Sequence, residues 1–483
     1  MEPAPTSTSP SERPLRGPVL TLLSGSSIAL ALSYLAQPLL TRLYTPEAFG
    51  VLDAFVALAS LLFVLGTLRY EDSLLLPHDE AEARGLLRLS VYILLGLGLL
   101  CLALSLPGRL LLARAGEAAL ADWLPWLGPA LLLMGGGRLA ELWLMRLETF
   151  RTLSAGTALR AATTTTLRLA AGLPPLQAGA AGLIGGFLGG HLSALLLYGW
   201  RLRRMPSEAS DPPPSLTALA RRYRRFPLFT LPAALLNALS MRLPFLLLLA
   251  FFDARVLGFF GRAFMVLSVP LGLVGGATGQ VFFVRAAEAR HGDGLAALTL
   301  RVYRRLLQVG LYPVLLLMLL GPDLFAFVFG QPWHTAGQYA VWIAPWLLLA
   351  GVASPLSRLF DVLERQRADF ATSVLLFLLQ TGALVVGGLQ GRPETALLLL
   401  GLAGVLGRLV QLGVLLHLAG VSLRDALAPV LRYALFSLPL LGLLYLSASY
   451  LRPSLHLGLA LLSVPLYLGL GVWLERHSTR SAH

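Results

Sequence analysis

Residues 89–106 read L-S-V-Y-I-L-L-G-L-G-L-L-C-L-A-L-S-L, which is 18 consecutive positions without a charged side chain. An α-helix needs about 20 predominantly apolar residues to cross the hydrocarbon core of a bilayer. Together with its flanking residues, this run predicts a transmembrane helix over residues 85–106. The run contains Cys101, the single cysteine of the chain, which excludes an internal disulfide and which we interpret as a helix-packing residue.

Runs of similar length and character recur to the end of the chain, and they predict about 14 transmembrane helices in total. The other predicted spans lie near residues 19–41, 47–69, 121–145, 153–173, 178–200, 228–250, 257–281, 303–320, 336–359, 369–390, 394–418, 428–449 and 454–474. The expected fold class is therefore an all-α integral membrane protein.

The overall composition supports the same fold class. Hydrophobic residues make up 56% of the 483 positions and charged residues only 13%, whereas a soluble protein carries about 25% charged residues. All 38 basic residues are arginine, and the formal net charge is +13. Two interpretations of the missing lysine remain open: a codon bias of the genome, or a cavity that binds phosphate through the rigid guanidinium fork. Nucleic-acid binding is a poor explanation, because the arginines lie mostly in short loops between apolar spans.

The distribution of arginine between the two sets of loops predicts the orientation of the chain. If the N-terminus is cytoplasmic, most loop arginines lie on the cytoplasmic side, including those of residues 201–204 and 221–225. The opposite side then holds only Arg42, Arg109, Arg114, Arg255, Arg392 and Arg452. The positive-inside rule accordingly places both termini in the cytoplasm.

The longest hydrophilic interruption, residues 201–226, divides the predicted spans into six before it and about eight after it. Residues 45–52 and 253–260 are weakly similar to each other, and each connects two spans, which suggests two parallel repeats. We expect two pseudo-symmetric six-helix bundles around a central cavity, followed by two additional helices. The predicted domains are a disordered cytoplasmic tail (1–18), an N-terminal bundle (19–200), a cytoplasmic linker (201–226), a C-terminal bundle (227–420), the two additional helices (421–475) and a cytoplasmic tail (476–483).

Several stretches, in this order, resemble one family of membrane proteins. They are Q-P-L-L-T-R-L-Y-T-P-E-A-F-G (37–50), L-R-Y-E (68–71), R-R-F-P (224–227), L-N-A-L-S (236–240), G-A-T-G-Q-V-F-F (276–283) and F-G-Q-P-W-H-T-A-G-Q-Y (329–339). Across residues 18–420 the chain resembles the polysaccharide-repeat (O-antigen type, Wzx-like) flippases of the multidrug/oligosaccharidyl-lipid/polysaccharide exporter (MOP) superfamily. It departs from the family pattern at Arg242, where an uncharged polar residue is commoner.

This resemblance implies a multi-pass transporter of the cytoplasmic (inner) membrane that acts in polysaccharide or lipopolysaccharide biosynthesis. Its substrate would be an undecaprenyl-diphosphate-linked oligosaccharide, moved by alternating access between two helical bundles. Membrane lipids, a polysaccharide polymerase and the glycosyltransferases of the same pathway are the expected partners. A flippase for the peptidoglycan lipid precursor and a cation-coupled multidrug exporter of the same superfamily remain alternatives.

Charged residues inside the predicted spans are the candidate site residues, because a charge at the bilayer centre costs about 2.5–3.5 kcal/mol on insertion scales. Arg138 and Glu141 lie three positions apart, after three consecutive glycines. They are either a local ion pair that eases insertion or part of a substrate cavity. Arg242 and Arg262 are either cavity residues that bind diphosphate or helix-packing residues. Arg42 and Asp53 flank the first hairpin and are candidates for a gate or ion-coupling pair, although Arg42 also fits a snorkelling residue.

An enzymatic function has no support in the sequence. The eight histidines are scattered without metal-ligand spacing, and no phosphate-binding loop of the Walker type is present. A polymerase or ligase for lipid-linked sugars would need a large extracytoplasmic loop, and the predicted outer loops are short. We therefore expect no catalytic residues, no metal site and no cofactor, and the residues do not decide between proton and sodium coupling.

The segment 323–339 contains Phe325, Phe329, Trp333 and Tyr339. Aromatic residues concentrate where a membrane helix meets the headgroup region. We interpret this segment as an outward-facing interfacial anchor, with sugar stacking as the alternative.

Overall fold

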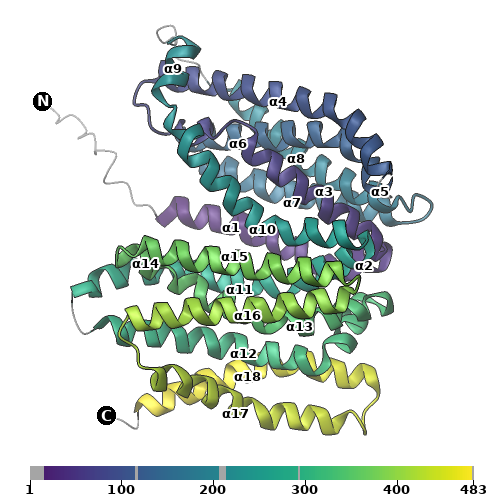
Figure 1. Ribbon diagram of the computed structural model, residues 1–483, viewed down its shortest axis with the longest axis vertical. Coiled ribbons are helices and arrows are strands. Elements are labelled where there is room, and N and C mark those ends of the chain that lie inside the picture. Colours follow the sequence, from purple (N-terminus) through teal and green to yellow (C-terminus); the bar gives the residue numbers. More distant parts are fainter. Residues whose placement is uncertain (1–15, 115–117, 206–213, 292–293, 481–483) are drawn as a thin grey trace, which may run out of the picture. The chain divides into compact units, whose positions relative to one another are not determined.

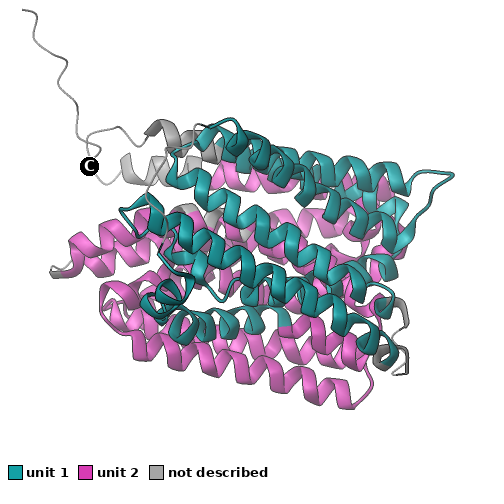
Figure 2. Cartoon of the chain, turned by 90° about the horizontal axis from the view of Figure 1, so that it is seen from above, with its two compact units in different colours: residues 1–242 teal, residues 243–483 magenta. Residues whose placement is uncertain are grey.

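The computed structural model describes residues 16–114, 118–205, 214–291 and 294–480 (Figure 1). Every regular element in these ranges is helical, so the predicted all-α fold class is confirmed. Most of the predicted N-terminal tail, the middle of the predicted linker and the last three residues, 481–483, lie outside the described residues. The chain separates into two compact units, residues 1–242 and residues 243–483 (Figure 2). The predicted domain boundaries stay a prediction.

Unit 1 is a bundle of long helices joined by short connections. Its helices are α1 (Arg16–Leu35), α2 (Gln37–Leu43), α3 (Pro46–Leu65), α4 (Glu80–Arg114), α5 (Ala118–Ala121), α6 (Leu127–Arg146), α7 (Phe150–Gly172), α8 (Gly179–Arg203) and α9 (Leu216–Arg222). The helix α10 (Leu231–Phe251) begins in unit 1 and ends in unit 2. Within the bundle, α7 packs against α1 and α8, while α6 packs against α4 and α8.

Unit 2 is a second helical bundle. After the end of α10 it contains α11 (Ala254–Glu288), α12 (Gly294–Phe329), α13 (His334–Leu356), α14 (Arg358–Val362), α15 (Gln366–Leu389), α16 (Pro393–Leu418), α17 (Leu423–Ser447) and α18 (Pro453–Arg480). The centre of this unit is formed by α13, which packs against α11, α12 and α16. The last two helices, α17 and α18, pack against α12, where Tyr312 stacks on Tyr467 with a ring-centroid distance of 4.5 Å.

Ten helices of the described chain are long and apolar enough to cross a membrane. Every predicted span overlaps a helix, but α1, α6, α7 and α11 are not among these ten. The sequence explains two of the four, since α6 and α7 each carry three charged residues, which lower their hydropathy. The chain is thus a multi-pass membrane protein, and the count of fourteen spans stays a prediction.

Helix α4, which contains residues 89–106, has one packed side and one exposed side. One side of α4 packs in unit 1 through Leu86 and Leu94, which are buried. Another side leaves Leu95, Leu99 and Leu106 exposed. Exposed leucines in a row are costly in water but are favourable in lipid, so this face of α4 is the lipid-facing one.

The aromatic segment 323–339 differs from its prediction. Phe325, Trp333 and Tyr339 are buried inside unit 2. The ring of Phe259 on α11 lies edge-on to both Trp333 and Tyr339, with centroid distances of 6.0 Å. The prediction of an interfacial anchor is wrong for these three residues, because the turn between α12 and α13 folds them into the core of the bundle.

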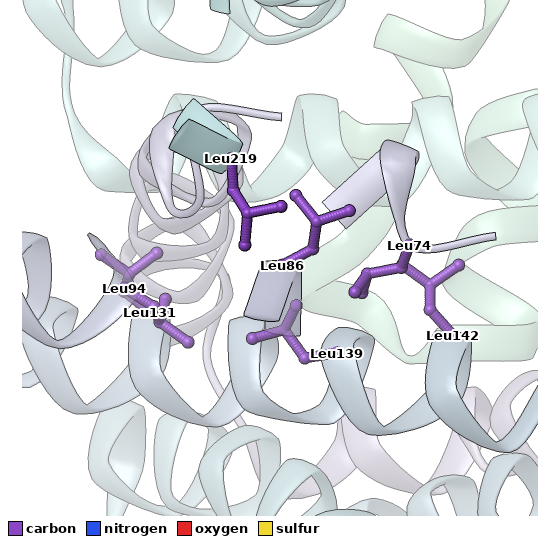
Figure 3. Close-up of a cluster of buried hydrophobic side chains, with 7 residues drawn as sticks. All are labelled: Leu74, Leu86, Leu94, Leu131, Leu139, Leu142 and Leu219. Carbon is purple, nitrogen blue, oxygen red and sulfur yellow. The ribbon is translucent and has the colours of Figure 1, made fainter. Parts of the chain in front are cut away.

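The short linker helix α9 is docked on unit 1. Leu219, which is 1% exposed, packs in one cluster with Leu74, Leu86 and Leu142 (Figure 3). The hydroxyl of Tyr70 donates a hydrogen bond of 3.1 Å to the carbonyl of Ala220. The second half of the predicted linker is therefore an ordered part of the N-terminal bundle.

Replacing Leu219 with alanine should release α9 from the bundle. Deletion of a buried leucine side chain costs about 2–5 kcal/mol, and α9 has only seven residues to hold it in place. Amide hydrogen exchange over residues 215–223 should become faster by more than about tenfold, since every 1.4 kcal/mol corresponds to a factor of ten. Leu228→Ala is the matched control, because Leu228 is 59% exposed; equal exchange in both variants would show that Leu219 does not anchor the helix.

Candidate functional site

Arg138 and Glu141 of α6 form an ion pair inside unit 1, with 3.8 Å between Nη1 and Oε2. Their spacing of three residues places them on one face of the helix, as the sequence analysis expected. A second guanidinium, that of Arg160 on α7, lies 3.9 Å from Oε1 of the same carboxylate. The hydroxyl of Tyr198 on α8 donates to this oxygen at 3.5 Å. Three helices therefore meet at Glu141.

The cluster of Arg138, Glu141, Arg160 and Tyr198 carries more positive than negative charge. Two guanidinium groups face one carboxylate, so the formal charge of the cluster is +1. The side chains of Arg138 and Arg160 are 41% and 38% exposed, compared with 23% for Glu141. Distances of 3.8 and 3.9 Å are longer than hydrogen bonds. Both guanidinium groups are thus loosely paired with Glu141 and partly exposed.

Glycines position this cluster. A Cβ at Gly156 would lie 2.1 Å from Cε1 of Tyr198, so the absence of a side chain in α7 lets the tyrosine ring reach Glu141. On α6, a Cβ at Gly135 would lie 2.5 Å from Leu94, which explains the close approach of α4. Nothing lies within 4 Å of a Cβ at Gly137. In the glycine run before Arg138, Gly135 thus allows a close approach of α4, whereas Gly137 faces open space.

Arg160 is a candidate site residue that was not predicted from the sequence. It lies in the predicted span 153–173, and a charge within a span was the signal that could have found it. Arg168 of the same helix has a structural role, since its Nε donates to the carbonyl of Leu183 at 3.0 Å. Arg160 thus lies next to a carboxylate of α6, whereas Arg168 is bonded to a backbone carbonyl of α8.

The other candidate residues of unit 1 lie on α2, α3 and α10. Arg242 on α10 is half-buried, and the carboxylate whose charge acts on it is that of Asp53 on α3. Arg42 is exposed at the end of α2. The gate or coupling role of Arg42 and Asp53 stays a prediction.

Arg262 belongs to unit 2, where it lies on α11 and is 7% exposed. A second intramembrane arginine of this unit, Arg408 on α16, donates a hydrogen bond of 2.6 Å to the side-chain oxygen of Gln411. Arg138, Glu141 and Arg242 belong to unit 1. The predicted convergence of arginines from both bundles on one cavity stays a prediction.

Within the described ranges, no group of three His, Cys, Asp or Glu side chains is arranged to hold a metal ion.

Comparison with known protein families identifies the chain. The family described as polysaccharide biosynthesis protein matches residues 39–338, which is more than half of the sequence. The chain belongs to the polysaccharide biosynthesis protein family. This match confirms the resemblance inferred from the sequence motifs, and it includes the whole cluster around Glu141. Among curated proteins, none matches the chain in sequence.

Solved structures with the same fold come from the MOP superfamily. The lipid II flippase MurJ in an inward closed conformation has a TM-score of 0.70 at 14% identity, covering 95% of this chain and 99% of its own. An inward-facing multidrug resistance MATE transporter has a TM-score of 0.63 at 17% identity, covering 83% and 99%. A MOP superfamily transporter from Pyrococcus furiosus, described by a binding pocket of reverse polarity, has a TM-score of 0.54 at 16% identity, covering 86% and 95%. This member of the polysaccharide biosynthesis protein family thus has the fold of MOP transporters and flippases.

Proposed function

We propose that this protein is a flippase that moves undecaprenyl-diphosphate-linked oligosaccharide repeat units across the cytoplasmic membrane by alternating access. The observation that carries the proposal is the positive cluster of Arg138 and Arg160 around Glu141, which is partly exposed in the helical bundle of unit 1. Membership of the polysaccharide biosynthesis protein family supports the class of substrate.

The chemistry of the cluster suits a diphosphate diester. Guanidinium groups form charge-assisted, often bidentate hydrogen bonds with phosphate oxygens. Glu141 weakens this attraction by compensating one positive charge. A transporter must also release its substrate, so a site of moderate affinity is more useful than a deep trap. We propose that Arg242 and Arg262 add further cationic contacts as the headgroup moves, while the polyprenyl chain stays in lipid.

The remaining parts of the proposal follow from the sequence. Both termini would be cytoplasmic, and the bundles of residues 19–200 and 227–420 would rock about the substrate, with Arg42 and Asp53 at a gate. A polysaccharide polymerase and glycosyltransferases, including those of O-antigen and lipopolysaccharide synthesis, would be the partners of the pathway.

Two alternatives from the same superfamily make different predictions. A flippase for the peptidoglycan precursor is favoured by the fold similarity to lipid II flippase MurJ, and it would use the same diphosphate chemistry. A cation-coupled drug exporter is favoured by the similarity to MATE transporters. Such an exporter needs an acidic site for cationic drugs, and the net charge of the cluster in unit 1 is positive.

Complementation distinguishes these functions. The chain should restore surface glycan to a bacterial strain that lacks its polysaccharide-repeat flippase, and it should not restore viability to a strain that lacks its peptidoglycan-precursor flippase. Rescue of viability alone would establish the first alternative. Resistance to cationic drugs without either rescue would establish the second.

A further inference from the structure

The end of the linker helix α9 and the residues after it form a strongly basic segment of unit 1. Residues 221–225 read R-R-Y-R-R, and no other five consecutive residues of the chain contain four arginines. All four arginines are exposed. The next element, the π-helical turn η4 (Phe226–Thr230), leads directly into α10. We call residues 221–230 the basic corner.

Contacts with α4 fix the orientation of α9. Leu219 is buried in the leucine cluster of unit 1. The guanidinium of Arg222 pairs with Oε1 of Glu82 on α4 at 2.8 Å, and the hydroxyl of Tyr223 donates to the same oxygen at 3.3 Å. Since Glu82 is 7% exposed, this carboxylate is taken up by α9 and does not compensate charges further out.

The other three arginines of the basic corner do not take part in this docking. No acid in the described part of the chain pairs with Arg221, Arg224 or Arg225. Their three positive charges lie within five consecutive residues of a segment that is held in place by its neighbours. The corner therefore presents a formal charge of +3 at one exposed place.

Apolar side chains are exposed beside these charges. Leu228 and Phe229 of η4 are 59% and 70% exposed. The segment η4 packs against η2 (Tyr70–Ser73), and the connection that contains η2 exposes Leu75 and Leu76 in turn. Arginines together with exposed apolar side chains are typical of segments that lie at the boundary between headgroups and acyl chains.

The candidate membrane spans place the basic corner at this boundary. One span, Phe226–Phe251, begins directly after Arg225, and α9 packs against α4, whose span begins at Glu80. The end of a span is where the chain leaves the hydrocarbon core and meets the headgroups. The distribution of arginine predicts that this connection is cytoplasmic, and the cytoplasmic leaflet has a negative surface potential.

We propose that the basic corner is a binding site for the headgroup of an anionic phospholipid. Arg221, Arg224 and Arg225 bind the phosphate through charge-assisted hydrogen bonds, and Leu228 and Phe229 contact the upper part of the acyl chains. An acidic protein segment would fit the charges, but it would not account for two exposed apolar side chains at the start of a span. The site is independent of the substrate that the protein transports.

Native mass spectrometry of the full-length protein in detergent tests this site with phosphatidylglycerol and phosphatidylcholine of the same acyl chains. An arginine near an anionic surface contributes about fivefold in affinity. Wild-type protein should therefore bind phosphatidylglycerol at least about tenfold more tightly than phosphatidylcholine. The combined variant Arg221→Gln, Arg224→Gln and Arg225→Gln should lose this preference.

The matched control is the combined variant Arg255→Gln, Arg392→Gln and Arg452→Gln. It removes the same charge from three exposed arginines that lie on separate parts of unit 2, so it should keep the wild-type preference. Equal loss of preference in both variants would show an effect of net charge and would overturn the site. Soluble glycerol phosphate should not displace the lipid at equal concentration; displacement would establish a simple phosphate site instead.

Hydrogen exchange of wild-type protein in nanodiscs provides a test that does not depend on the folding of a variant. Amides of residues 215–230 should exchange more slowly in phosphatidylglycerol than in phosphatidylcholine, because the bound headgroup holds the corner in place. Equal exchange in the two lipids, or equal affinity of wild-type protein for them, would overturn the proposal. Surface-glycan rescue tests the transported substrate separately.

Discussion

Combined replacement of Arg138, Arg160 and Glu141 by glutamine should abolish translocation of the lipid-linked oligosaccharide. Each charge-assisted hydrogen bond contributes about 1.5–3 kcal/mol. Loss of two such donors should therefore weaken diphosphate binding by more than about 100-fold. Glutamine at position 141 prevents the variant from leaving a half-buried carboxylate without its cations. Such an unpaired carboxylate could destabilise the fold, and loss of folding would then be mistaken for loss of binding. Binding of UDP-N-acetylglucosamine and restoration of surface glycan measure the effect.

The single variant Glu141→Gln separates charge from packing in the same cluster. It removes the only carboxylate that pairs with Arg138 and Arg160 in the described contacts, so the formal charge rises from +1 to +2. Probe affinity should increase while transport slows, because release becomes limiting. Asp361→Asn is the control for the loss of an acidic charge, since Asp361 forms an exposed pair with Arg358 at 3.5 Å. For the preceding prediction, normal transport by the variant in which Arg138, Arg160 and Glu141 are all glutamine would show that the cluster has no part in the proposed mechanism.

A methyl group at Gly337 should strongly destabilise unit 2. Gly337 lies on α13, where an added Cβ would be 2.4 Å from the carbonyl oxygen of Gly321 and 2.5 Å from Cα of Pro322, both on α12. These are backbone atoms, which cannot move without separating the two helices. Overpacking costs about 1–3 kcal/mol when side chains can adjust, so we expect Gly337→Ala to cost at least about 3 kcal/mol.

The matched control for Gly337→Ala is Gly382→Ala in α15, because nothing lies within 4 Å of a Cβ at that position. Alanine is the better helix former by about 1 kcal/mol, so this variant should be as stable as wild type or more stable. Thermal unfolding followed by tryptophan fluorescence in detergent compares the two. Equal melting temperatures would show that α12 and α13 are not in backbone contact.

The sequence by itself was sufficient for the features that depend on local chemistry. Apolar runs such as residues 89–106 have to become helices in lipid, because a helix bonds its own backbone groups without help from the rest of the chain. The pair of Arg138 and Glu141 was predictable for the same reason, since a spacing of three residues brings side chains together on any helix. The resemblance to flippases was also available from motifs read in order.

Only the tertiary structure decided which side chains from distant helices meet. It added Arg160 and Tyr198 to Glu141, and it buried Trp333 and Tyr339 in unit 2 and Glu71 in unit 1. The physical reason is that lipid chains and the protein interior are equally apolar, so a leucine on either face of a membrane helix gives the same signal in the sequence. Glycines such as Gly156 and Gly337 then allow close packing against one particular helix. Which helix this is cannot be read from the glycine itself, because it depends on the residues of the opposite helix.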